Sequence, residues 1–193
     1  MKKKTIRYSA FLIAAVLAIG SFSVWAMNTQ ATAEAGVDIG EAPAGLNVDS
    51  ENPGNIIDTG ILGRPGSLEE INLFTIQQPH ENTYDGEYEV TVYVANAGEL
   101  QSEFRYLTID LVAENATGDT ADVGYVTLEN GMVTFSIDHS DVQELSEDGG
   151  EDMMISVDGG SYQFFGDNND EPDVEFLVDI SEGATGDLVD FTE

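Results

Sequence analysis

From residue 68 onward the chain alternates short apolar-rich runs with turn residues, and this pattern limits the folds open to it. Residues 87–95 show it best, with an apolar side chain at every second position from Tyr88 to Val94. That spacing is the period of a half-buried strand. The same reading applies to further runs, namely residues 71–76, 104–112, 123–129, 132–137, 153–157, 161–165, 174–180 and 188–191. The chain is therefore predicted to be all-β, an antiparallel β-sandwich of jelly-roll or Ig-like type.

Two glycine-containing turns are predicted to close hairpins. Asn130-Gly131 lies between two strand-like runs, and both residue types accept the positive φ of a two-residue hairpin turn. Asp158-Gly159-Gly160 separates the next two runs in the same way. Helical character is expected in residues 141–146 alone, with Ser140 as a possible N-cap.

The first 26 residues have the pattern of a secretory signal. Lys2, Lys3, Lys4 and Arg7 precede an apolar stretch, and a small-residue cleavage site ends at Ala26, with residues 31–33 as a later option. An uncleaved anchor is the alternative, because the apolar stretch approaches the roughly 20 residues that span a bilayer. Both readings export the rest of the chain, which is predicted to be secreted, extracellular or on the cell surface. Residues 27–66 are interpreted as an extended N-terminal arm and residues 67–193 as the β-sandwich domain.

Charge limits the partners of the exported chain. After residue 26 there is no lysine, and Arg64 and Arg105 stand against 37 Asp and Glu, a net charge of about −35. Self-repulsion of this size destabilises a compact monomer, and salt or bound divalent cations relieve it. Nucleic acid is excluded as a partner on charge grounds, and membrane contact is expected only through an uncleaved signal.

The sequence gives little support for catalysis. It contains no cysteine, and the exported part has no lysine and only two histidines, His80 and His139. Cysteine nucleophiles, lysine Schiff bases and thiolate metal sites are therefore excluded. Motifs of zinc proteases, phosphate-binding loops and serine hydrolases are absent from the sequence. We predict that the chain is not an enzyme.

Calcium is the cation that the sequence favours. Asp167, Asn169, Glu171 and Asp173 place oxygen ligands in one loop between two predicted strands. A solvated acidic loop is the alternative, and residues 147–152 form a second acidic cluster. Asn115 begins an Asn-Ala-Thr glycosylation sequon.

Several short motifs resemble those of the camelysin/TasA family of secreted fibre-forming proteins. They are the lysine-led signal that ends in Trp25-Ala26, a variable arm, Arg64-Pro65-Gly66, and a strand that ends in the turn from Ala95 to Leu100. The resemblance implies a jelly-roll subunit that polymerises by donating an N-terminal strand to its neighbour.

The residues are compatible with a homopolymer of this kind, because an extended arm before a sandwich can add to an open sheet edge. The donor piece is expected in residues 35–49, where Val37, Ile39, Leu46 and Val48 form two short alternating pairs. Without lysine there is no isopeptide bond, so assembly is predicted to be non-covalent. The alternatives are a monomeric secreted acidic module that binds calcium, glycan or a surface protein, and a hydrolase that uses only carboxylates.

Overall fold

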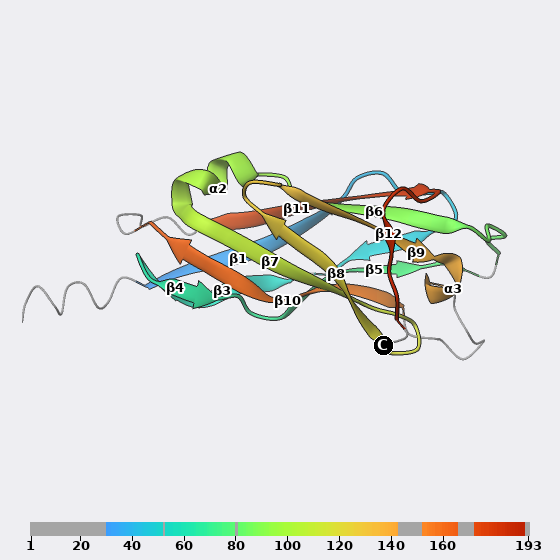
Figure 1. Ribbon diagram of the computed structural model, residues 1–193, viewed down its shortest axis with the longest axis horizontal. Helices are drawn as coiled ribbons and strands as arrows, with labels where there is room; N and C mark the ends of the chain where they lie inside the picture. The colour runs from blue at the N-terminus through green and yellow to red at the C-terminus, as the bar shows by residue number, and fades with distance from the viewer. Residues whose placement is uncertain (1–29, 52, 80, 143–151, 166–171, 192–193) are drawn as a thin grey trace, which may run out of the picture. The chain divides into compact units, whose positions relative to one another are not determined.

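The computed structural model divides the chain into two units, Met1–Gln30 and Ala31–Glu193. It describes residues 30–51, 53–79, 81–142, 152–165 and 172–191, and these form a sandwich of two packed sheets (Figure 1). The strands are β1 (Gln30–Ile39), β2 (Asn47–Ser50), β3 (Gly54–Ile61), β4 (Pro65–Ser67), β5 (Ile71–Gln77), β6 (Glu87–Val94), β7 (Phe104–Glu114), β8 (Thr120–Thr127), β9 (Met132–Asp138), β10 (Met153–Phe164), β11 (Asp173–Glu182) and β12 (Asp187–Leu188). Two short helices, α2 (Ala97–Glu103) and α3 (His139–Val142), complete the described elements.

The two sheets have different strand patterns. The first has the order β12-β9-β6-β11-β1-β3, and the second has the order β2-β5-β10-β7-β8, with β4 also paired to β10. In the first sheet β1 runs parallel to β11 and β12 runs parallel to β9. The expectation of a purely antiparallel sandwich is therefore wrong for this sheet, which is mixed. The reason is that β1, at the start of the described chain, and β12, near its end, each pair with a strand that runs in the same direction.

The core lies between the sheets and follows the predicted alternation. In β6 the side chains of Tyr88, Val90 and Val92 are fully buried, and in β11 those of Val174 and Val178 are fully buried too. The neighbouring positions along both strands are mostly exposed or half-buried. Burying one large apolar side chain contributes about 1.5–3 kcal/mol, so this alternation fixes the register and inward face of each strand.

Asn130-Gly131 does not close a hairpin. β8 belongs to the second sheet and β9 to the first, so this turn carries the chain from one sheet to the other. A two-residue hairpin turn of type I′ needs positive φ at both central residues, but among the described residues only glycines have it. Gly131 has φ +66, and the Asn130 side chain instead accepts a hydrogen bond from the Thr127 backbone N–H at 2.7 Å.

The second predicted hairpin is also absent, because β10 is one continuous strand of 12 residues. Gly159 and Gly160 lie inside it with φ of +124 and +128. They produce an irregularity in the pairing with β7, where the register shifts between Val157 and Gly160. The two glycines therefore bulge a long strand instead of reversing the chain.

Helix α2 was not predicted. It follows Asn96, whose backbone carbonyl accepts hydrogen bonds from the N–H groups of Glu99 and Leu100. Leu100 is buried and anchors the helix to the core, and an acidic side chain in the first turn suits the helix dipole. In the predicted helical segment, α3 covers His139–Val142, and residues 143–146 lie outside the described part of the chain.

Candidate functional site

Two of the predicted donor residues, Val37 and Ile39, belong to β1, which lies within the first sheet. Its neighbours are β11 on one side and β3 on the other. The parallel register with β11 runs from Glu34 opposite Asp173 to Ile39 opposite Val178. The segment that was predicted to be an arm, residues 27–66, thus supplies β1 to β3 and the start of β4 in the described structure.

The inward face of β1 consists of small side chains. Ala31, Ala33 and Ala35 recur at every second position and are 7%, 0% and 8% exposed. On the neighbouring strand Gly60 leaves room for this approach, because a Cβ there would lie 3.0 Å from the Ala31 carbonyl oxygen. Alternation of alanines is a weak apolar signal, so the sequence reading missed this part of the strand. The period-2 spacing of the three alanines is the signal that could have located it.

The residues directly after the C-terminal end of β1 form backbone hydrogen bonds with β11. Gly40 N–H donates to the Val178 carbonyl at 2.8 Å, and Ile180 N–H donates to the Glu41 carbonyl at 2.7 Å. The Asp179 carboxylate accepts a hydrogen bond from Glu41 N–H at 2.9 Å. A Cβ at Gly40 would meet that carboxylate, so a side chain there would displace Asp179 from its bond to Glu41.

The four predicted donor residues fall in different sheets. Val37 and Ile39 belong to β1 and are half-buried against the core. Leu46 precedes β2 and is buried, and Val48 belongs to β2, where it lies opposite Ile76 of β5. Residues 40–46 carry the chain from the first sheet to the second. Residues 35–49 are therefore two separate strand segments in this structure.

The free edge of β8 is occupied by side chains of the same chain. Among the described strands β8 has only β7 as a neighbour. The Asn130 side chain accepts from Thr127 N–H at 2.7 Å and donates to the Tyr125 carbonyl at 3.4 Å. The Asp122 carboxylate accepts from Gly124 N–H at 2.8 Å. Backbone groups that could pair with another strand are thus partly satisfied, a common protection of edge strands.

The cluster around His139 has the geometry of a helix start. The Asp138 carboxylate accepts hydrogen bonds from the Ser140 hydroxyl at 2.6 Å and from the Ser140 N–H at 2.9 Å. These bonds lower the pKa of Asp138, whereas burial raises the pKa of Asp141. His139 Nδ1 lies 3.2 Å from Asp138. Since the Ser140 hydroxyl donates to a carboxylate and not to the histidine, the arrangement lacks the serine–histidine contact of a catalytic triad.

The predicted calcium loop lies mostly outside the described residues. Asp167, Asn169 and Glu171 are not described, and Asp173 is an exposed residue at the start of β11. Within the described ranges, no group of three or more His, Asp or Glu could hold a metal ion. The calcium site stays a prediction.

The predicted glycosylation site is folded into a turn. Asn115 is 8% exposed, and its side-chain oxygen accepts hydrogen bonds from the Thr117 N–H and hydroxyl and from Asp119 N–H. Glycosylation of Asn115 stays a prediction.

Comparison with protein-family models and with curated proteins finds no match for this chain. The resemblance to the camelysin/TasA family therefore rests on its short motifs. Of these, Pro65-Gly66 lies in β4, and the predicted turn after Asn96 is the start of α2. In the described part of the chain, no helix has the length and apolar character needed to cross a membrane.

Proposed function

We propose that this protein is a structural subunit of an extracellular filament or cell-surface layer, as in the camelysin/TasA family. Its subunits have a jelly-roll or Ig-like sandwich and assemble non-covalently by exchanging β1 between neighbours. The observation that carries the proposal is the position of β1, an interior strand that is joined to the rest of the sandwich through residues 40–46. With the predicted signal removed, a neighbour's β1 can take this place without threading the chain.

The free energy that holds β1 in its own subunit is small enough for β1 to be exchanged between subunits. Three buried alanines contribute only about 2–3 kcal/mol in total, at roughly 0.8 kcal/mol for each buried methyl group. The remaining stabilisation of β1 comes from the half-buried side chains of Val37 and Ile39 and from main-chain hydrogen bonds to β11 and β3. A β1 from a second copy recovers the same contacts, so exchange itself costs little free energy. A donor and an acceptor on opposite sides of one subunit make a heterologous contact, which extends into a filament when it does not close.

Three of the four edges of the described sheets support the same route. β8 is protected by Asn130 and Asp122, while β2 and β12 have four and two residues. These edges offer little backbone for edge-to-edge stacking. β3, the fourth edge, has eight residues, so pairing along β3 is the competing route, and it would leave β1 in its own subunit.

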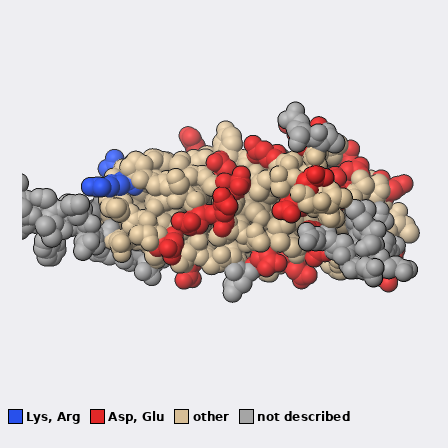
Figure 2. Space-filling model, turned by 90° about the horizontal axis from the view of Figure 1, so that it is seen from below, with Lys and Arg blue, Asp and Glu red and all other residues tan. Residues whose placement is uncertain are grey.

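The negative charge of the subunits should make their assembly depend on the salt concentration. The described cationic residues are Arg64 and Arg105. Figure 2 shows Lys and Arg side chains at one end of the sandwich, with Asp and Glu spread over the rest of the visible face. Like charges on neighbouring subunits repel one another at low salt. Filaments are therefore expected in molar salt, where the Debye length falls to about 3 Å.

An engineered disulfide tests the exchange directly, because the natural chain contains no cysteine. Gly36 and Glu175 are paired across β1 and β11 and are both exposed. A Cβ at Gly36 meets no other atom within 4 Å. Cysteines in adjacent strands fall within the roughly 4.4–6.8 Å Cα separation that a disulfide needs. The variant is G36C/E175C, made in the chain from residue 27 onward.

The expected result is a ladder of covalent multimers when filaments of G36C/E175C are oxidised and run on a non-reducing gel. Single variants G36C and E175C serve as controls and should give dimers at most. Filaments that yield only internally crosslinked monomers would show that β1 stays in its own subunit. Absence of filaments from the unmodified chain in low and molar salt, judged by electron microscopy, would refute the polymer itself.

A further inference from the structure

Two exposed tyrosines share the outer face of β7 and β8. Tyr106 is 39% exposed and Tyr125 is 57% exposed, the only aromatic side chains among the four large apolar residues that stand out from the described surface. Asp110 lies opposite Tyr125 in the strand register, and Tyr106 and Asp110 are four residues apart on β7. Side chains at this spacing, and in directly opposed pairs, point to the same side of a sheet.

The surface around these tyrosines is hollowed in two places. One hollow, of about 570 Å³, is lined by Tyr106, Phe165, Gln101 and Thr108, among others. The other, of about 410 Å³, is lined by Tyr125 and three aspartates, Asp110, Asp122 and Asp158. They meet end to end, because the Thr108–Thr127 pair of the first is followed by the Asp110–Tyr125 pair of the second. We call this combined feature the β7–β8 furrow.

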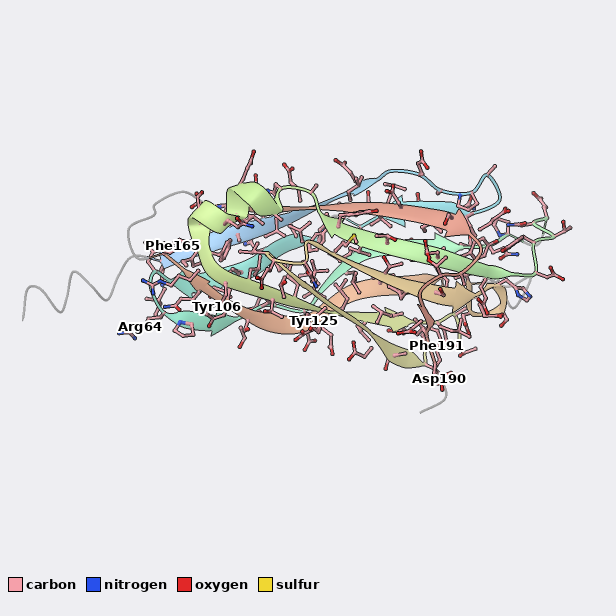
Figure 3. The ribbon with its side chains drawn as sticks, turned by 45° about the horizontal axis from the view of Figure 1, so that its top comes forward. Arg64, Tyr106, Tyr125, Phe165, Asp190 and Phe191 are labelled. Carbon is pink, nitrogen blue, oxygen red and sulfur yellow. The ribbon has the colours of Figure 1, made fainter. Side chains whose placement is uncertain are left out.

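The aromatic side chains of the furrow are spaced along it. Figure 3 shows Phe165, Tyr106 and Tyr125 in that order along the strands. Four residues of strand and one strand spacing separate the two tyrosines, which corresponds to about 14 Å at 3.3 Å per residue and 4.8 Å between strands. The Arg105 guanidinium lies over the Phe165 ring, 5.6 Å from its centre. The spacing is rigid because β7 is paired with β10 and with β8 along its length.

We propose that the β7–β8 furrow binds a linear, uncharged polysaccharide. Aromatic rings offer flat apolar faces to the C–H faces of sugar rings. The carboxylates of Asp110, Asp122 and Asp158 and the side-chain oxygen of Gln101 accept hydrogen bonds from hydroxyl groups. An open furrow that spans about 14 Å between two tyrosines suits a polymer of several sugars and not a single small ligand.

Two alternatives fit this surface less well. Protein partners cover contiguous apolar patches, whereas polar residues such as Thr108 and Asp110 separate the two tyrosines here. A second copy of this chain would also bring its own excess of carboxylates toward three aspartates. An anionic polymer is disfavoured for the same electrostatic reason, because the chain carries a net charge of −31. This binding site is separate from β1, so it does not depend on the filament proposal.

The test uses the chain from residue 27 onward with four probes: swollen amorphous cellulose, soluble β-1,3-glucan, chitosan and alginate. Affinity is measured by depletion onto the insoluble polymers and by affinity electrophoresis in the soluble ones. The variant is Y106A/Y125A. Its matched control is M132A/L188A, which removes the other two exposed large apolar side chains and leaves the furrow intact. Circular dichroism and thermal unfolding establish that both variants are folded.

The expected result is binding to at least one of the two neutral glucans that Y106A/Y125A weakens tenfold or more and M132A/L188A leaves within twofold. Lack of binding to both glucans would overturn the proposal, and so would binding that the tyrosine change leaves unaltered. Binding to chitosan alone, abolished by 0.5 M NaCl and insensitive to the tyrosines, would mean simple charge attraction and would also overturn it. Self-association that needs the tyrosines, with no glucan binding, would overturn it too and assign the furrow to contacts between copies.

Discussion

The Asn130 side chain holds the backbone of Thr127, with its Oδ1 atom 2.7 Å from the Thr127 nitrogen, at an edge where β8 has no strand neighbour among the described strands. The same side chain donates to the Tyr125 carbonyl. One asparagine thus makes the two hydrogen bonds that a residue of an added strand would make. Its position shortly after β8 explains how this edge is protected without a further strand.

Replacing Asn130 with alanine should expose this edge. We expect N130A to lose about 1 kcal/mol of unfolding free energy, because a net hydrogen bond contributes roughly that amount. It should also increase irregular association, because the freed backbone groups can pair with another chain. Urea denaturation and light scattering measure the two effects. N130D retains an acceptor for Thr127 N–H and is the matched control, so equal behaviour of both variants would contradict this role.

The two glycines of the β10 bulge should respond differently to alanine. Both have positive φ, a conformation that costs a non-glycine residue about 1–3 kcal/mol. A Cβ at Gly160 would also collide with the Thr108 carbonyl oxygen, whereas a Cβ at Gly159 meets nothing within 4 Å. We therefore expect G159A to lose about 1–2 kcal/mol and G160A roughly 3 kcal/mol or more. Chemical denaturation compares them, and equal losses would rule out the steric contribution of Thr108.

The sequence predicts local features of this fold well and long-range pairing poorly. The inward faces of β6 and β11 follow from alternation, because burial at every second residue is a property of each strand alone. The structure formed at a turn sequence, in contrast, depends on more than its own residues. Asn130-Gly131 and Gly159-Gly160 have the composition of hairpin turns, yet the path of the chain after each one depends on strand partners far away. β9 pairs with β6, and β10 pairs with β7 on both sides of its glycines.

The candidate assembly site shows the same division. Val37 and Ile39 are apolar and β-branched, so they indicate a strand, and the structure places both in β1. Ala31, Ala33 and Ala35 carry too little apolar weight to indicate one. Gly60 of β3 also leaves room beside Ala31, because a Cβ there would lie 3.0 Å from the Ala31 carbonyl oxygen. Nothing local to residues 30–39 could predict a parallel neighbour more than 130 positions away, as β11 is.

Alkaline pH should weaken the fold through Tyr88. Burial raises the pKa of its phenol above the ordinary value of 10.0. A group whose folded pKa is raised contributes stability that is complete below its unfolded pKa and is lost as the pH rises through the folded pKa. We expect the free energy of unfolding to fall from about pH 10 upward. Urea denaturation between pH 8 and pH 11 gives the curve.

The Tyr88 contribution can be isolated with phenylalanine. The Tyr88 hydroxyl donates to the side-chain oxygen of Gln78 at 2.9 Å, and Gln78 is only 1% exposed. Y88F leaves that buried acceptor without this donor, so it should lose about 1–3 kcal/mol at pH 8. It should also show a shallower decline above pH 10 than the unmodified chain. Y125F, at an exposed tyrosine, is the control, and an equally steep decline in Y88F would contradict the assignment.

Salt should stabilise this protein, most visibly where carboxylates gather in the β7–β8 furrow. Asp110, Asp122 and Asp158 line one hollow, and like charges that share one hollow repel one another in dilute buffer. The double variant D110N/D158N removes two of the three charges with little change in shape. We expect it to gain about 0.5 kcal/mol over the unmodified chain in 50 mM NaCl, comparable to the energy of exposed charge pairs.

That gain should vanish in 1 M NaCl, where the Debye length is about 3 Å. Urea denaturation of both proteins across the salt series measures it. E69Q/E70Q removes two charges from outside the furrow and is the matched control. An advantage of D110N/D158N that persists at 1 M NaCl would point to local packing or hydrogen bonding. If D110N/D158N gains more unfolding free energy than E69Q/E70Q at 50 mM NaCl, and the gain disappears at 1 M, then charge repulsion is stronger in the furrow than elsewhere on the surface.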